Sequence, residues 1–175
     1  MRPVIVSAVA LGNSPWGVIS YLQNAFAVGL AAIPTSGASL TYKVQHTLDD
    51  LSLFRPAVIS RTTTVATVTD ADHRASVGDS VTIVGSGDPN LEGTFDIASI
   101  VDANTYTYTV SNTGLTASVP GTTALRMRVF DHAVMTGLTT RSDGNYAFPV
   151  QAVRLKVTSY TSGKVDLIAL QGMGR

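Results

Sequence analysis

The sequence contains no cysteine and few charged residues. Without cysteine, neither a disulfide framework nor thiolate chemistry is available. Charged residues make up 14% of the chain, against about 25% in typical soluble domains. Charged residues are depleted at the cores of protein interfaces. This low fraction of charged residues therefore favours a component of an assembly over a free monomer.

The chain also lacks a basic stripe, a signal sequence and a long apolar run. Lys and Arg together number 12, as do Asp and Glu, so the formal net charge is zero. Nucleic-acid-binding domains usually carry a basic face, so we expect no nucleic-acid partner. The most apolar stretch, Ala25 to Ile33, is too short to cross a bilayer as a helix. The N-terminus does not resemble a signal peptide, and we expect a protein made in the cytoplasm with no membrane partner.

Helical periodicity is nearly absent, and short runs rich in Val, Ile, Thr and Tyr alternate apolar with polar residues instead. Such runs, separated by Gly, Pro, Asn, Asp and Ser, are typical of antiparallel sheets. The pattern predicts an all-β protein, an antiparallel sandwich of the jelly-roll type. A short helical turn remains an alternative for Leu48 to Pro56, Ser111 to Thr123 is predicted as a loop, and Arg141 to Asn145 as a turn. The expected strands are residues 4–9, 16–21, 26–33, 40–46, 62–69, 81–84, 94–97, 105–110, 125–129, 133–138, 153–158 and 165–170.

A change of composition near Arg61 predicts two domains. From there to about Thr123 the chain is dominated by Thr and Val. After Thr123 the composition is again like that of the first 60 residues. We therefore expect a parent β-sandwich built from residues 1–60 and 124–175, with a small β domain of residues 61–123 inserted into it. Insertions at loop tips are tolerated because loop closure costs little. A continuous single barrel is the alternative.

Several segments resemble proteins of bacteriophage particles. In the parent domain, Leu40 to Asp50, Asp143 to Val150 and Ala152 to Gly163 look like segments of small phage virion proteins. In the middle of the chain, Ser76 to Ile83, with Leu91 to Phe95 and Asn104 to Tyr108, is similar to a β module of phage virion and tail proteins. The resemblance implies a structural role, with an adhesive or spacing function for the inserted module and no catalytic residues.

A catalytic site is not expected from the histidines. The chain has three, His46, His73 and His132, and Asp131 beside His132 allows a Ser-His-Asp triad only on paper. A triad depends on geometry, no Gly-x-Ser-x-Gly elbow is present, and neighbours on one strand point to opposite faces. We assign no catalytic residue, and His46 is expected to be a hydrogen-bonded residue on a strand face.

No cofactor or metal residue is assigned either. Asp and Asn in β turns usually bond nearby backbone, and the spacing of an EF-hand is absent. The segment Gly85 to Gly87 lacks the Lys and the helix of a phosphate loop. Aromatic residues are expected to pack in the core or in an interface rather than to form a sugar platform. The residues weighed were Asp70, Asp72, His73, Asp79 and Asp88 for a metal, and Trp16, Phe26, Phe54, Tyr146 and Phe148 for a sugar.

These observations predict a non-enzymatic, multi-copy piece of a phage particle. The expected role is a capsid decoration protein that bridges capsid subunits, made in the host cytoplasm and located in the virion. Its partners would be the major capsid protein or other virion proteins, and copies of itself, with a trimer as one option. Apolar sequence at both ends, Pro3 to Val6 and Val165 to Leu170, would either add a strand to a neighbour's sheet or pair within its own sandwich. The alternatives are a tail, head-tail adaptor or receptor-binding module, and a polysaccharide-acting tail enzyme.

Overall fold

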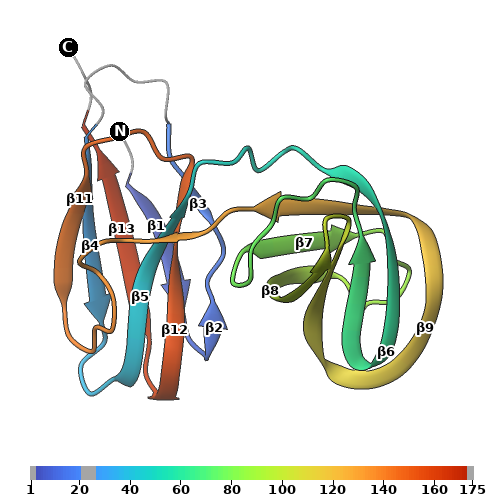
Figure 1. Cartoon of the computed structure of the whole chain (residues 1–175). Helices are drawn as coiled ribbons and strands as arrows, with labels where there is room; N and C mark the ends of the chain where they lie inside the picture. Colours follow the sequence, from blue (N-terminus) through green and yellow to red (C-terminus); the bar gives the residue numbers. More distant parts are fainter. Residues whose placement is uncertain (1–2, 21–26, 173–175) are drawn as a thin grey trace. The chain divides into compact units, whose positions relative to one another are not determined.

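A computed structural model describes residues 3–20 and 27–172. Within these ranges the regular secondary structure consists of strands, joined by turns and irregular segments (Figure 1). All strand pairings are antiparallel. The predicted all-β class is therefore confirmed. The chain divides into two compact units, a parent unit of Met1–Leu48 with Phe130–Arg175 and an inserted unit of Asp49–Val129.

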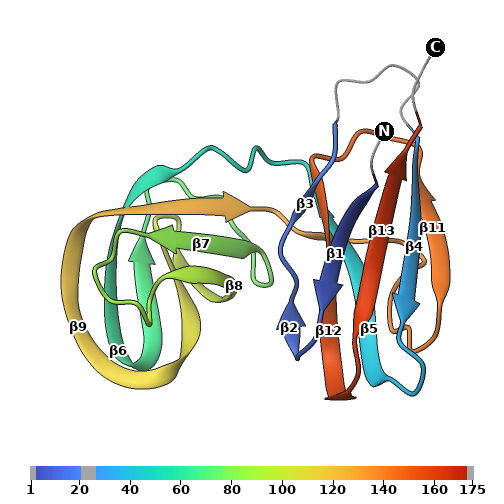
Figure 2. The same cartoon turned by 180° about the vertical axis from the view of Figure 1, so that it is seen from behind.

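The parent unit consists of two sheets. Sheet A faces the viewer in Figure 2, and sheet B lies in front in Figure 1. Sheet A has the order β1 (Val4–Ala8), β13 (Val165–Gln171), β4 (Val28–Pro34) and β11 (Ser142–Tyr146). Sheet B has the order β10 (Phe130–Asp131), β5 (Ser39–Thr47), β12 (Ala152–Ser162) and β2 (Gly12–Asn13), with β3 (Gly17–Val18) also paired to β12.

Alternation along the strands builds the core between these sheets. In β13, Val165, Leu167 and Ala169 are buried while the residues between them are more exposed. Because successive side chains in a strand point to opposite faces, these residues meet the buried side chains of sheet B. The core cluster unites Val6, Leu30, Tyr42, Val44, Leu155 and Val157 with them.

The inserted unit is a single strongly bent sheet. It contains β6 (Arg55–Thr69), β7 (Ser80–Val84), β8 (Gly93–Asp102) and β9 (Thr105–Met127). Strand β9 pairs with β6 between Thr105 and Ala124, with several bulges, and it also pairs with β8 near its start and with β7 near its end. Because β7 also pairs with β8, the hairpin of β7 and β8 links the two ends of β9, which curls around them in Figure 1.

The boundaries of the inserted unit differ from those expected from composition. Cutting at residues 60/61 and 123/124 would divide both β6 and β9, whose pairing begins at Arg55 and Ala124. The Thr-rich composition starts in the middle of β6, after its apolar first half. A change of composition therefore marks a change of environment along one strand, not the start of the unit.

Three local predictions are wrong. Residues 111–123 form part of β9 instead of a loop, and Arg141 to Asn145 runs into β11 instead of turning. Pairing with the distant strands β6 and β4, which local composition does not encode, decides these two outcomes. Residues 133–138 are irregular apart from an isolated bridge at Leu138. Leu48 to Pro56, where a helical turn was the alternative, contains a turn and the start of β6 but no helix. Tyr21 and Phe26, which belong to two expected strands, lie outside the described residues.

Candidate functional site

Both ring nitrogens of His132 are engaged by backbone. Its Nε2 donates to the carbonyl of Asn145 at 3.2 Å, which leaves Nδ1 to accept the backbone N–H groups of Val134 and Met135 at 3.3 Å. His73 has the same arrangement in the inserted unit, with Nε2 against the Asp102 carbonyl and Nδ1 accepting from Ala75 N–H. Each imidazole is buried and braces a loop.

Asp131 points away from His132, as expected of neighbours on one strand. Its carboxylate accepts hydrogen bonds from Lys43 Nζ at 2.7 Å and from Gln45 Nε2 at 2.8 Å. Gln45 in turn accepts from Arg154 Nε at 3.0 Å, and the Arg154 guanidinium lies 4.5 Å from the centre of the Trp16 ring. Asp131 and His132 therefore do not form part of a Ser-His-Asp triad.

His46 belongs to an aromatic cluster. Its Nδ1 lies 3.1 Å from the hydroxyl of Tyr146, and its ring packs against Phe130, Tyr146 and Phe148. Burial, and next the nearby His132, lower the pKa of His46. Burial also raises the pKa of Tyr146 far above its ordinary value, so the phenol keeps its proton and donates to His46.

Aromatic side chains are partly accessible in both units. Phe148 and Phe54 are exposed, Trp16 is half-buried against Arg154, and Tyr146 is buried. Phe26 lies outside the described residues. Trp16 and Tyr146 thus have the packing role expected of them.

The acidic residues considered for a metal site have separate partners. Asp70 pairs with Arg126, Asp72 with Arg74, and Asp88 with Arg61. Asp79 accepts the backbone N–H groups of Ser76 and Val129. No group of three possible metal ligands occurs among the residues that the structure describes.

The loop at Gly85 to Gly87 is held by its own side chains. The Ser86 hydroxyl bonds the Asp88 carbonyl at 3.0 Å, and Glu92 accepts the Gly87 N–H at 3.2 Å. With a carboxylate already on this N–H, the loop does not form a cradle for a phosphate.

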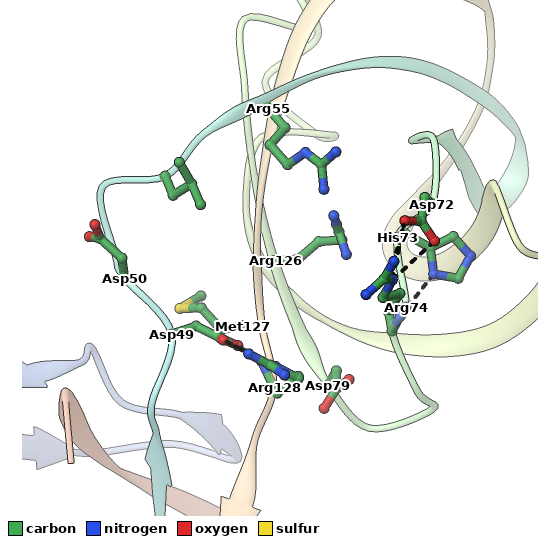
Figure 3. Close-up of a pocket in the computed structure, with 12 residues that line it drawn as sticks. Asp49, Asp50, Arg55, Asp72, His73, Arg74, Asp79, Arg126, Met127 and Arg128 are labelled. Carbon is green, nitrogen blue, oxygen red and sulfur yellow. Dashed lines mark hydrogen bonds and ion pairs between the residues drawn. The ribbon is translucent and has the colours of Figure 1, made fainter. Parts of the chain in front are cut away.

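A cleft of about 330 Å³ within the inserted unit gathers several charged side chains (Figure 3). It lies beside the start of β6, the loop before β7 and the end of β9. Its charged and histidine residues are Asp49, Asp50, Arg55, Asp72, His73, Arg74, Asp79, Arg126 and Arg128, and Leu53, Ala75 and Met127 complete the lining.

The carboxylates of this cleft have partners. Burial tends to raise the pKa of Asp49, but hydrogen bonds from the side chain and backbone of Arg128 hold it below the ordinary value. Two hydrogen bonds from Ser52 lower the pKa of Asp50. The Arg74 hydrogen bonds likewise lower the pKa of Asp72. These three carboxylates, with their lowered pKa values, therefore stay ionised at neutral pH.

Two arginines of the cleft differ from the others. Arg55, which is exposed, forms no ion pair or hydrogen bond with any described residue. Arg126 uses Nε against Asp70, and its terminal nitrogens have no recorded partner among the described residues. Figure 3 shows the two guanidinium groups turned toward one another. Sequence reasoning missed both, because they lie far apart in sequence. Arg126 belongs to an expected strand, whereas Arg55 belongs to none.

The comparisons with known proteins are sparse. No known protein family and no curated protein matches the sequence. Among solved structures, the phage phi92 endosialidase is similar with a TM-score of 0.36 and 18% identity, over 74% of this chain and 20% of that chain. The match spans a fifth of that protein's length, and a likeness at this level says nothing of activity. None of the described segments is a helix long and apolar enough to cross a membrane.

Proposed function

We propose that this chain is a non-enzymatic structural protein of a bacteriophage particle, and more narrowly a decoration protein that binds capsid subunits in many copies. The observation that carries the proposal is the apolar outer face of sheet A. Outward positions of an antiparallel sheet facing water are normally polar. On sheet A they include Ile5, Ala31, Ile33, Ile168 and Leu170.

This face is continuous across three paired strands. Ile5 on β1 is opposite Ile168 on β13, which is opposite Ala31 on β4. Ile5 and Leu170 are more than half exposed. Asp166 interrupts the surface, and it is held by Ser7 and Lys164. Contiguous exposed apolar surface of this kind marks a protein interaction site.

Sheet B has the opposite character. Its outward positions carry the half-buried Lys43 and Lys156 and the buried Gln45 and Arg154, joined in part through the Asp131 network. A sandwich with one apolar and one polar outer face suits a subunit that lies on another protein through its apolar face.

The strand order supports a viral role. Following the chain, β1 lies in sheet A, β2 and β3 in sheet B, β4 in A, β5 and β10 in B, β11 in A, β12 in B and β13 in A. We infer from this alternation between the two sheets the order of a jelly roll, a fold shared by viral capsid domains, lectins and cupins. The inserted unit occupies the connection from β5 to β10.

The apolar chain ends do not act as free arms in this structure. Strand β1 pairs with β13 inside its own sandwich and buries Val6 and Ala8. Removing residues 1–7 would therefore damage the core, so it cannot separate binding from folding. Substitution of an outward side chain is the better test.

The test compares Leu170→Lys with Thr158→Lys. Leu170 is 54% exposed on sheet A, and Thr158 is exposed on sheet B, so each lysine points to solvent without entering the core. Co-sedimentation with undecorated capsids of the phage that encodes the chain should show binding for the parent sequence and for Thr158→Lys. Leu170→Lys should weaken it at least about tenfold, because a charge is desolvated in the contact.

Three outcomes would contradict the proposal. Equal capsid binding by both lysine variants would show that the outer face of sheet A does not contact the capsid. Binding to host cells but not to capsids would replace decoration by a receptor-binding role. Hydrolysis of a polysaccharide that is lost in His132→Ala would restore the enzyme alternative.

A further inference from the structure

The guanidinium groups of Arg55 and Arg126 form an incomplete electrostatic arrangement in the inserted unit. Like charges turned toward one another in a cleft repel, and an oxyanion between them would accept charge-assisted hydrogen bonds from both. Asp72 attracts both guanidinium groups electrostatically, but its hydrogen bonds go to Arg74, and Asp49, Asp50 and Asp79 are likewise hydrogen-bonded to other groups. Asp70 meets Arg126 from the Nε side and leaves the terminal nitrogens for a ligand.

We propose that this cleft binds a small hydroxylated ligand that carries an oxyanion, a sugar acid or a sugar phosphate, with its charged group between Arg55 and Arg126. Planar guanidinium groups match the oxygens of carboxylates and phosphates. Arg126 is held in place by its buried ion pair with Asp70, whereas Arg55 is free to adjust. One fixed and one adaptable guanidinium group can bind either a planar carboxylate or a tetrahedral phosphate.

The rest of the cleft indicates the size and polarity of the ligand body. Its volume of about 330 Å³ is at the lower end of the range for ligand sites, about 300–1,000 Å³, which fits a single sugar unit. Leu53, 64% exposed, offers an apolar surface at one side. Asp50 and Asp72 remain ionised and can accept hydrogen bonds from ligand hydroxyls.

This site does not depend on the decoration role. It lies wholly in the inserted unit, whereas the capsid-binding face proposed above lies on sheet A of the parent unit. A failure of ligand binding would leave the capsid assay untouched, and the reverse also holds.

The experiment is a nuclear magnetic resonance titration of the full ¹⁵N-labelled chain at low ionic strength. The probes are glucuronate, glucose 6-phosphate, inorganic phosphate and glucose. We expect saturable shifts around the cleft with glucuronate, with glucose 6-phosphate or with both, and weaker binding of phosphate and of glucose. Glucuronate or glucose 6-phosphate binding more tightly identifies which oxyanion is preferred.

The variants are Arg55→Gln, Leu53→Ser and the matched control Arg141→Gln. Arg141 is also an exposed arginine, but it lies in the parent unit, so its loss changes net charge equally. Arg55→Gln should weaken binding about tenfold, the effect of losing one charge-assisted hydrogen bond, and Arg141→Gln should not. Leu53→Ser should weaken the binding of glucuronate and glucose 6-phosphate but leave the binding of inorganic phosphate unchanged.

Several results would overturn the assignment. Equal weakening by Arg55→Gln and Arg141→Gln would mean that only net charge attracts the anion. Glucose binding as tightly as glucuronate would show that the oxyanion contributes nothing to binding. Phosphate binding as tightly as glucose 6-phosphate would show that the sugar contributes nothing. The absence of saturable shifts with every probe would refute the site.

Discussion

The two units bury polar groups in different ways. The parent unit has a core cluster of aliphatic side chains and Tyr residues between two sheets, and its buried Arg154 lies on an outer sheet face under Trp16. The inserted unit has a smaller core and holds two ion pairs at low exposure, Arg61 with Asp88 and Arg126 with Asp70.

The difference follows from the number of sheets. Two facing sheets can enclose a layer of apolar side chains about 10 Å thick, which leaves the polar residues outside. A single bent sheet encloses less volume, so long side chains from its strands meet inside it. The inserted unit should therefore depend on individual charge pairs, and the parent unit on packing.

The largest effect is expected from removing the inserted unit along two different boundaries. Joining Leu48 to Phe130 by a short Gly-Ser link should leave a folded parent unit, because Phe130 already pairs with His46 on the neighbouring strand. Deleting residues 61–123 should give an aggregating protein, because it strips the partners from the apolar first half of β6. The fluorescence of Trp16, the only tryptophan, reports unfolding of the parent unit alone.

Cooperative unfolding of the first deletion, with stability changed by no more than about 1 kcal/mol, would establish that the parent unit folds by itself. A soluble and cooperative 61–123 deletion would contradict the boundary drawn at Asp49–Val129 and favour the one expected from composition.

The second effect concerns the buried ion pair of the inserted unit. Asp70→Asn removes the charge opposite Arg126, and breaking a buried pair leaves an uncompensated charge. The Asp70 side chain is 1% exposed, so we expect a loss of about 3 kcal/mol in the free energy of unfolding. Asp72→Asn, two residues away, removes a pair that is exposed on both sides and should change little.

Amide hydrogen exchange of β9 measures both variants. Equal protection in Asp70→Asn and Asp72→Asn would show that burial does not distinguish the two pairs, and the comparison between the units would fail at its central point.

A third test addresses packing in the parent unit. A Cβ added at Gly144 on β11 would lie 2.7 Å from Met135 Sδ and 3.1 Å from the His132 ring. Met135 is fully buried, so Gly144→Ala should cost about 2 kcal/mol through overpacking. Gly29→Ala on the adjacent strand is the matched control, because its Cβ would meet only a carbonyl oxygen at 3.8 Å.

Urea unfolding followed by Trp16 fluorescence gives both values. A Gly144→Ala protein as stable as Gly29→Ala would mean that the loop containing Met135 yields easily, against the close packing assigned to this unit.

The sequence predicted the fold class and most strands, because alternation is a local signal. The strands expected at residues 153–158 and 165–170 lie within β12 and β13, where Val153, Leu155, Val165 and Leu167 alternate inward. Their closeness in sequence suggests a hairpin, and that expectation is wrong, because β12 belongs to sheet B and β13 to sheet A. Alternation also predicted that the side chains of Asp131 and His132 point to opposite faces of the strand. Residues 111–123 were missed, because their partners on β6 lie about fifty residues earlier and not in the local pattern.

The candidate cleft was beyond sequence reasoning for a related reason. Arg55 and Arg126 stand at opposite ends of the inserted unit in sequence, and the pairing of β6 with β9 brings those ends together. The outer face of sheet A was also hidden, because Ile168 and Leu170 look like core residues until their register against β1 and β4 is known.

The smallest expected effect is a pH dependence confined to the parent unit. Burial lowers the pKa of His46 below its ordinary value of 6.5, so the folded state binds the proton less readily than the unfolded state. Stability is then full above pH 6.5 and falls as the pH drops from there toward the lowered pKa. Protonation also ends the acceptance of the Tyr146 hydrogen bond at Nδ1.

His46→Gln should flatten this dependence, because glutamine keeps an acceptor for Tyr146 and does not titrate. The carboxylates with lowered pKa values, Asp131 and Asp166, lose their stabilising charge only in more acidic solution, so they leave the window near pH 6 to His46. Thermal unfolding followed by Trp16 fluorescence, at steps from pH 7.5 to pH 5, measures the slope. The same slope in both proteins would assign the proton uptake to another group and show that the aromatic cluster tolerates a charged His46.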